Sequence, residues 1–257
     1  MIIDTHIHLD DERYDEDLEA VLERAREAGV ERFIIPGADP RTLPKAIAIA
    51  ERYDEVCFAV GVHPYDMEHY DEAPFREFLD HPKCVAVGEC GLDYYRLEGS
   101  DGEKAAEKAR QAEVFRAQIR IAREYAKPLI VHIRDAGHDA RVLLEAEAGP
   151  EGGVLHCYNA DEELLVLAER NFYYGIGGVL TFKNARKLVN VLPKIPRERL
   201  LLETDGPYLT PHPYRGKRNE PAYTRLVAEK VAELLEIPVA EVEASTTENA
   251  RRLFRIG

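Results

Sequence analysis

Residues 2–9 read Ile2-Ile3-Asp4-Thr5-His6-Ile7-His8-Leu9, and the rest of the chain is best interpreted from this stretch. Its β-branched and apolar residues predict a strand that runs into two histidines spaced by one. Because side chains alternate between the faces of a strand, His6 and His8 lie on the same side. Two imidazoles aimed at one point lose hydration without a packing gain unless they share a partner, usually a divalent metal ion. The alternative is a hydrogen-bonded pair of histidines at a strand end, and the short motif alone leaves both open.

Length and composition limit the class of protein. The chain has 257 residues, of which 45% are hydrophobic, and this suffices for a large core. No stretch has the length and apolar character of a membrane span, and the amino terminus lacks the features of a signal peptide, so we expect a cytoplasmic protein without a membrane partner. The cysteines show no Cys-x-x-Cys spacing, which favours reduced and buried thiols: Cys57, Cys84, Cys90 and Cys157.

The net charge of -14 argues against a protein that holds nucleic acid by a broad basic face. Such binding needs clustered Lys and Arg to neutralise many phosphates. A small pocket that binds one phosphate remains compatible with this charge.

Apolar runs and amphipathic helical segments alternate from end to end of the chain. Strands are expected at residues 2–8, 32–37, 56–62, 84–89, 128–132, 153–156, 172–176 and 199–203. Helices are expected at 18–25, 43–53, 73–81, 103–125, 137–146, 161–170, 184–192 and 227–235, followed by a short terminal helix capped by Ser245 and Glu248. Eight such units in about 250 residues predict a (β/α)8 TIM barrel, an α/β fold with a single domain over residues 1–257. An open doubly wound sheet is the alternative.

In a barrel of this kind, catalytic groups lie where the strands end and the loops to the helices begin. Ionisable residues fall at these points in most of the predicted strands: His6, His8, His63, Glu89, His132, His156, Glu203 and Asp205. Each alone is typical of an ordinary loop residue, but their joint placement predicts a metal site. One catalytic zinc takes about three protein ligands, so two divalent ions are the better count. A carboxylate bridges two cations, and Glu89 is the candidate for that position.

Longer motifs extend this pattern over nearly the whole chain: Asp4 to His8, Gly61 to Pro64, Gly88 to Tyr95, Arg134 to Ala136, His156-Cys157, Thr181 to Ala185, Leu202 to Leu209, Arg215 to Pro221 and Thr247 to Asn249. On these motifs the chain resembles the TatD family of metal-dependent deoxyribonucleases, within the amidohydrolase-type barrels. Two positions depart from the family pattern: Cys90, which we expect to face away from Glu89, and the run Tyr158-Asn159-Ala160, which we expect to border the pocket.

The resemblance implies a division of the ligands between two divalent ions, with Zn, Mn, Mg and Co as the candidates. One ion would be held by His6, His8 and Asp205 and the other by His132 and His156, with Glu89 as the bridge. The resemblance also implies hydrolysis of phosphodiesters in DNA from the 3′ end, at single-stranded or frayed ends. No obligate protein partner is evident.

Catalytic and substrate-binding roles can be assigned as hypotheses. We expect Asp205 to orient the attacking water and accept its proton, and Glu89 to hold the two ions together. We expect the phosphate to be held by residues around this centre: His63, Arg134, Lys183 and the Tyr158 loop. A basic run follows the last predicted strand and contains Arg215, Lys217 and Arg218. It either adds to the positive charge around the phosphate or is an ordinary solvated loop.

Two other functions stay open at this point. The first is hydrolysis of a small ester, lactone, amide or phosphoester, or of an aminoacyl-tRNA ester, because a fold and its metal ligands do not fix the substrate. The second is a metal-binding scaffold without activity. A catalytic centre keeps an open position and a pocket, whereas a structural site is filled by protein ligands.

Overall fold

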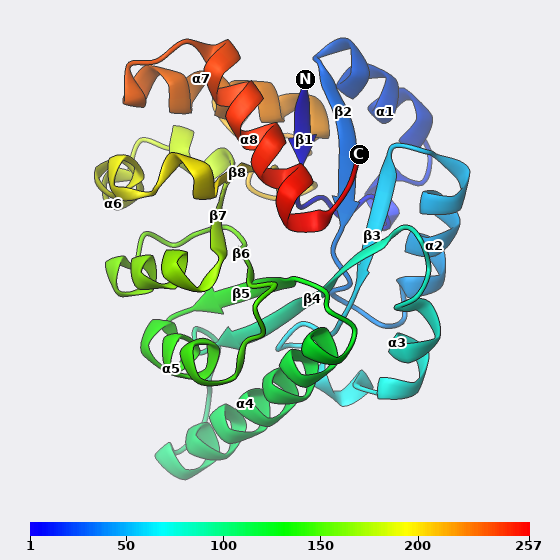
Figure 1. The fold of residues 1–257 in the computed structure, drawn as a ribbon, viewed down its shortest axis with the longest axis vertical. Helices are drawn as coiled ribbons and strands as arrows, with labels where there is room; N and C mark the ends of the chain where they lie inside the picture. Colours follow the sequence, from blue (N-terminus) through cyan, green and yellow to red (C-terminus); the bar gives the residue numbers. More distant parts are fainter.

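The structure is a computed structural model that describes residues 1–257, and its centre is an eight-stranded parallel sheet with the strands in chain order (Figure 1). The strands are β1 (Ile2–Asp4), β2 (Val30–Ile35), β3 (Val56–Val60), β4 (Cys84–Asp93), β5 (Leu129–Arg134), β6 (Gly153–Leu155), β7 (Phe172–Ile176) and β8 (Leu200–Leu202). The backbone N–H of Thr5 donates to the carbonyl oxygen of Leu202 at 3.1 Å, and that of Asp205 donates to His6 at 2.9 Å. These bonds join the last strand to the first, so the predicted TIM barrel is confirmed and the open sheet is wrong.

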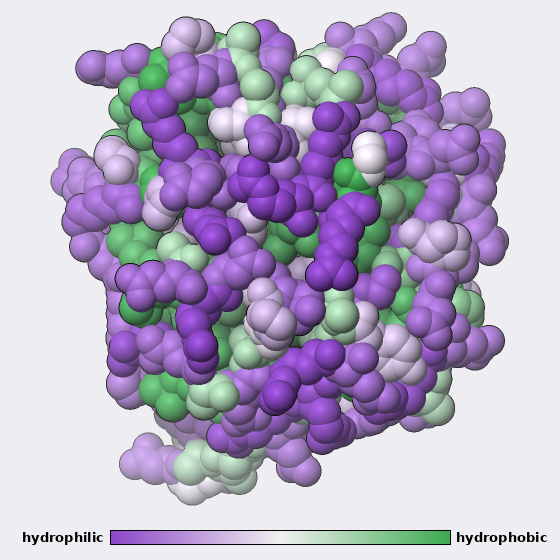
Figure 2. All heavy atoms as spheres, viewed as in Figure 1, coloured by the Kyte–Doolittle hydropathy of each residue, from purple (hydrophilic) through white to green (hydrophobic).

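Helices connect the strands and surround the barrel. The α-helices are α1 (Leu18–Glu27), α2 (Leu43–Arg52), α3 (Glu72–Phe78), α4 (Asp101–Glu124), α5 (Gly137–Glu147), α6 (Arg186–Val191), α7 (Thr224–Leu235) and α8 (Val239–Phe254). The 3₁₀ helices are η1 (Glu12–Tyr14), η2 (Met67–His69), η3 (Glu162–Arg170), η4 (Gly178–Thr181), η5 (Leu192–Lys194), η6 (Arg197–Arg199) and η7 (Pro221–Tyr223). The face of the molecule seen in Figure 2 is covered mostly by hydrophilic side chains, with apolar residues in separated groups.

Two apolar layers hold the barrel together. The inner layer takes residues from all eight strands, among them Ile3, Ile130 and Tyr173, and it also includes Leu253 and Phe254 of α8. Figure 1 shows α8 beside β1 and β8, where it closes one end of the barrel. Thr247 of α8 donates to the carbonyl oxygen of Met1, just before β1, and Asn249 of α8 donates to that of Leu200 at the start of β8, both at 2.9 Å. This closed end is therefore the amino-terminal one. The carboxyl ends of the strands are therefore left for the loops that carry the ionisable residues.

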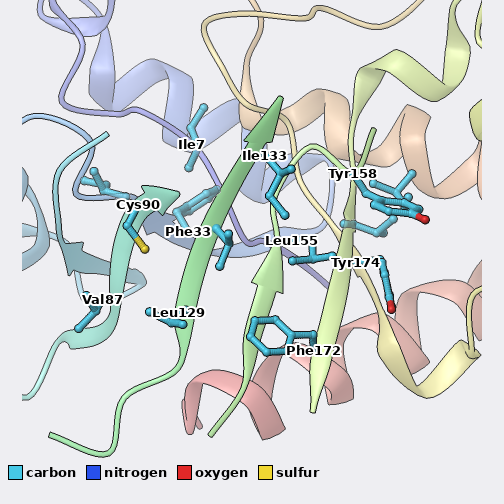
Figure 3. Close-up of a cluster of buried hydrophobic side chains, with 14 of the residues drawn as sticks. Ile7, Phe33, Val87, Cys90, Leu129, Ile133, Leu155, Tyr158, Phe172 and Tyr174 are labelled. Atoms are coloured by element: carbon cyan, nitrogen blue, oxygen red, sulfur yellow. The ribbon is translucent and has the colours of Figure 1, made fainter. Parts of the chain in front are cut away.

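The outer layer lies between the strands and the helices. Figure 3 shows part of it, with Leu129, Leu155 and Phe172 from neighbouring strands. Cys90 also lies in this layer and is fully buried, so it faces away from the carboxylate of Glu89 as expected. All four cysteines are free, although Cys157 is only partly buried.

Several predicted boundaries are wrong, among them the end of the third strand, at Val60 instead of residue 62, and the start of α7, at Thr224 instead of residue 227. Three further differences have identifiable reasons. The first strand ends at Asp4, and Ile3 faces the inner layer whereas Ile7 packs in the outer one, so strict alternation stops between them. The fourth strand continues beyond Glu89 to Asp93. Ser245 caps no helix, because its hydroxyl donates to the carbonyl oxygen of Val242 at 3.2 Å inside α8, which satisfies it within a continuous helix.

The helix predicted at 161–170 is a 3₁₀ helix, η3. Asp161 accepts a hydrogen bond from the N–H of Glu163 at its start, and Asn171 ends it in a left-handed conformation. Sequence periodicity places this element correctly, but it does not distinguish the two kinds of helix.

Candidate metal centre

Three of the predicted ligands face one another where β1 and β8 end. Nε2 of His6 lies 3.3 Å from Nε2 of His8, and Oδ1 of Asp205 lies 3.5 Å from the His8 nitrogen and 3.8 Å from the His6 nitrogen. Atoms that share one cation at about 2.1 Å stand roughly 3–3.5 Å apart. The spacing of these three donors is therefore close to that of ligands around a single ion.

Glu89 lies between this group and a second pair of histidines. Its Oε2 is 3.3 Å from Nε2 of His6 and 4.0 Å from Nε2 of His8. Its Oε1 is 3.1 Å from Nδ1 of His132 and 3.8 Å from Nε2 of His156. Each carboxylate oxygen thus faces a different pair of imidazole nitrogens, which is the arrangement that a bridging carboxylate needs.

The histidines of the second pair are each contacted by a further carboxylate on the opposite ring nitrogen. Nε2 of His132 lies 2.9 Å from Oδ2 of Asp93, and Nδ1 of His156 lies 3.0 Å from Oε1 of Glu203. The hydrogen bond to Asp93 keeps the proton of His132 on Nε2 and leaves the lone pair on Nδ1, which faces Glu89. For His156, the carboxylate of Glu203 favours the same outcome at Nδ1 by its charge, although the two atoms are not aligned as a hydrogen bond. The donor set of imidazole lone pairs and carboxylate oxygens fits two divalent cations.

Asp93 was missed by the sequence analysis although the sequence carries a signal for it. Glu89, Gly91 and Asp93 alternate with apolar residues, so a strand that continues beyond Glu89 directs all three toward the same face. Gly91 has a φ of 143°, and a Cβ at this position would lie 2.0 Å from the carbonyl oxygen of His132. Glycine therefore permits the close approach of β4 to β5 that brings Asp93 beside His132.

Burial and the neighbouring charges set the protonation of this group. Burial raises the pKa of Glu89, but the charges of His6 and His156 hold it well below its ordinary value. Burial also raises the pKa of Asp205, but a hydrogen bond from His8 and the charges of His156 and His6 together hold it below its ordinary value. Burial lowers the pKa of His156, and the surrounding carboxylates raise it to about 10. Glu89 and Asp205 are thus ionised at neutral pH. Where no cation is bound, protonated histidines such as His156 balance their negative charge.

Of the residues predicted to hold the phosphate, Arg134 and Tyr158 line a cavity beside the metal centre, whereas His63 and Lys183 do not. A cavity of about 760 Å³ opens beside the centre, and its lining includes His132, His156 and Asp205 together with Arg134 and Tyr208. The Tyr158 loop also lines this cavity, as expected. The Tyr158 hydroxyl donates to the carbonyl oxygen of Asp161 at 2.7 Å, so it is already committed within the loop.

His63 lies at the edge of the centre, with Nε2 3.8 Å from Oε1 of Glu89. Its Nδ1 accepts a hydrogen bond from the N–H of Tyr65 at 3.1 Å, which leaves the proton on Nε2. Burial lowers the pKa of His63 to about 4, so the ring is neutral and presents an N–H donor. This side chain is therefore suited to donate to a ligand.

The predicted basic residues on the loops after β7 and β8 lie further out. Lys183 is exposed and does not line the cavity, although the segment 184–188 that follows it does. Arg218 pairs with Asp17 at 2.7 Å and with Glu220 at 3.0 Å, so its charge is neutralised within the protein. Of the run at 215–218, only Arg215 and Lys217 are free of carboxylate partners.

Comparison with known proteins supplies the class. The TatD related DNase family matches residues 3–255. A metal-dependent hydrolase named YabD from Bacillus subtilis is 47% identical, and the alignment covers 100% of this chain and 100% of YabD. The 3′-5′ ssDNA/RNA exonuclease TatD of Edwardsiella piscicida is 35% identical over 99% of this chain and 100% of its own. The crystal structure of YJJV, a TatD homolog from Escherichia coli, superposes with a TM-score of 0.90 at 31% identity and covers 100% of this chain and 98% of its own.

The barrel, the donors at its carboxyl end and these relatives together define a metal-dependent hydrolase. The chain belongs to the TatD family. None of its helices is both long and apolar enough to cross a membrane.

Proposed function

We propose that residues 1–257 form a single hydrolase domain that cleaves phosphodiesters in single-stranded DNA from the 3′ end. The observation that carries the proposal is the position of Glu89, whose two oxygens face separate histidine pairs beside an open cavity. Two relatives of 35% identity carry the name 3′-5′ ssDNA/RNA exonuclease, which favours a nucleic acid over a small ester. The open cavity favours a catalytic centre over a structural metal site.

We assign one divalent ion to His6, His8 and Asp205 and the other to His132 and His156, with Glu89 between them. When bound, such ions neutralise phosphate charge and make a water molecule more acidic than bulk water. The protein's own task is to hold the donors at fixed distances. The contacts of Asp93 and Glu203 support this task because they orient the two imidazoles of the second ion.

The remaining residues act on the water and on the phosphate. Asp205 is ionised and lies at the edge of the cavity, so it accepts the proton of the attacking water at a carboxylate oxygen. The N–H on Nε2 of His63 donates to an oxygen of the phosphate, and the Arg134 guanidinium neutralises its charge. Lys183 lies outside the cavity lining, and its proposed contact is with a phosphate further along the strand.

The test combines elemental analysis with product mapping. Protein loaded separately with Mn²⁺, Mg²⁺, Co²⁺ or Zn²⁺ is incubated with single-stranded DNA labelled at the 5′ or the 3′ end, and in parallel with small esters and amides. We expect two ions per chain and release of mononucleotides from the 3′ end. Turnover of the small substrates with intact DNA would contradict the nuclease proposal, and a full complement of ions without any hydrolysis would favour the scaffold.

A further inference from the structure

Large aromatic side chains are exposed at one end of the molecule only. The exposed large hydrophobic residues include four tyrosines, with exposed fractions between 36% and 59%: Tyr65, Tyr95, Tyr208 and Tyr214. Tyr65 follows β3, Tyr95 follows β4, and the other two follow β8. All four therefore lie on loops at the carboxyl ends of strands, around the metal centre. The protein has 13 tyrosines, and the ones outside these loops are more buried.

Each exposed tyrosine has a cation over its ring. The guanidinium of Arg134 lies 3.6 Å from the ring centre of Tyr95, and that of Arg13 lies 4.4 Å from that of Tyr208. Arg96 covers Tyr65 at 4.8 Å, and Lys217 covers Tyr214 at 5.5 Å. Of the four cations, Arg13 pairs with a carboxylate, Asp11 at 2.8 Å, and the other three form no salt bridge. In a chain with a net charge of -14, uncompensated cations beside exposed rings point to an anionic ligand with flat groups.

The pairs stand on both sides of the metal centre. In a ring of eight strands β4 lies opposite β8, so the Tyr95–Arg134 pair faces the Tyr208–Arg13 pair across the barrel mouth. The ring of Tyr208 is 6.0 Å from that of His8. Arg134 and Tyr208 line the same cavity as His132 and Asp205. A ligand that reaches from one pair to the other therefore passes over the metal donors.

A single strand of nucleic acid has the chemistry that these pairs recognise. Every base presents a flat face that stacks on an aromatic ring, and every linkage carries a charge that an arginine neutralises. Stacking tolerates all four bases, which suits a site that degrades strands of any sequence. A small ester or amide has neither the repeating charge nor the length to contact two pairs on opposite sides of the barrel.

We propose that the Tyr95–Arg134 and Tyr208–Arg13 pairs are two nucleotide-binding subsites, one on each side of the metal centre. The tyrosine of each pair stacks on a base. Arg134, which has no carboxylate partner, contacts the adjoining phosphate, whereas Arg13 is paired with Asp11 at 2.8 Å and holds the ring of Tyr208 in place. The proposal rests on the proposed function and deepens it: the substrate is a single strand that spans the barrel mouth, and its affinity rises with length until both subsites are filled.

The experiment measures binding as well as turnover. Anisotropy of labelled phosphorothioate oligothymidylates of two and eight nucleotides gives Kd for wild type, Tyr95→Ala, Tyr95→Phe, Tyr208→Ala and Tyr208→Phe. We expect each alanine to weaken binding of the octamer about tenfold, with a smaller loss for the dimer, and each phenylalanine to restore it because the ring is kept. Arg134→Ala lowers the slope of log affinity against log salt by about 0.7. The matched control is Arg52→Ala, which removes a guanidinium lying 5.1 Å from the ring of Tyr53, away from the barrel mouth.

The outcomes separate the two proposals. If DNA is hydrolysed but the alanine variants bind the octamer as wild type does, the subsites are wrong and the nuclease stands. Equal losses for dimer and octamer would also overturn the subsites, since they would indicate a disturbed centre rather than a lost base contact. If the wild type neither binds nor hydrolyses any oligonucleotide, the nuclease proposal fails and the subsites fail with it.

Discussion

Replacing Asp93 by Asn tests whether the carboxylate beside His132 sets the proton on that ring. Asn has the same shape and keeps the acceptor for the N–H of Tyr95, which Oδ1 of Asp93 receives at 2.9 Å. At the other oxygen, 2.9 Å from Nε2 of His132, an amide group donates where the carboxylate accepted. The imidazole then carries its proton on Nδ1, 3.1 Å from Glu89, and loses the lone pair that a cation needs.

The expected magnitude follows from the role of such carboxylates. Removing a partner that orients a metal-binding histidine costs about 10–100-fold in metal affinity, which is about 1.4–2.7 kcal/mol. Calorimetric titration of the purified protein with Mn²⁺ measures this loss for one of the two ions, and thermal melting of both proteins without metal shows whether the fold is kept.

A matched control comes from Asp71. Its Oδ1 accepts the N–H of Ala73 at 3.0 Å, two residues ahead, as Asp93 does with Tyr95, but it contacts no histidine. Asp71→Asn therefore keeps the same local turn, and we expect its metal affinity to equal that of wild type. Equal metal affinity in Asp93→Asn and wild type would refute the reasoning, because the tautomer of His132 would then not depend on the carboxylate.

Three further predictions concern the bridging carboxylate, the bound ions and an ion pair outside the metal centre. Glu89→Gln removes a bridging oxygen, so we expect bound metal to fall below two ions per chain and hydrolysis to be lost with an unchanged circular dichroism spectrum; full activity would remove Glu89 from the mechanism. Divalent ions at 100 times their Kd stabilise the native state by about 2.7 kcal/mol per site. We therefore expect Tm to rise by roughly 5–10 °C for each site filled, or about 10–20 °C for both, relative to chelator-treated protein, and an unchanged Tm would contradict the site. Burial raises the pKa of Glu220, but the hydrogen bonds and charges of Arg24 and Arg218 together hold it below its ordinary value of 4.5. The ion pair therefore stabilises the fold above pH 4.5, and this stabilisation is lost as pH falls through the lowered pKa. Glu220→Gln is then less stable than wild type in urea at pH 7, and the difference shrinks below pH 4.5; a difference independent of pH would refute this ion-pair effect.

The sequence predicts the barrel and the gathering of histidines and carboxylates at one end of it, because both depend on repeated patterns. Eight apolar runs separated by helices leave few alternatives, and histidines or acids at several strand ends must then meet at one mouth. This argument brings His6, His8 and Glu89 to one mouth, but strand alternation does not explain why His6 and His8 face each other, because β1 ends at Asp4. The division of ligands between two ions came from the family resemblance, and it remains a proposal.

The features that local sequence patterns do not place depend on contacts between segments that are distant in the sequence. The alternation from Glu89 to Asp93 indicates that β4 continues, but the contact of Asp93 with His132 also needs the close approach of β4 to β5 at Gly91. The pairing of Arg13 with Tyr208 joins residues from opposite ends of the chain, and no local periodicity encodes it. At Ser245 a local pattern predicted a helix start that does not exist, because the residue lies inside α8, which begins at Val239.

The helix that closes one end of the barrel has a consequence for synthesis of the chain. Phe254 and Leu253 cover the inner apolar layer, and Asp205 stands far downstream of His6, so neither the sealed interior nor the full donor set exists on a partly translated chain. At about 5–20 residues per second, the ribosome needs on the order of 10–40 s between the first histidine and the last strand. During that interval the inner apolar layer is uncovered at the end of the barrel that α8 closes in the finished chain.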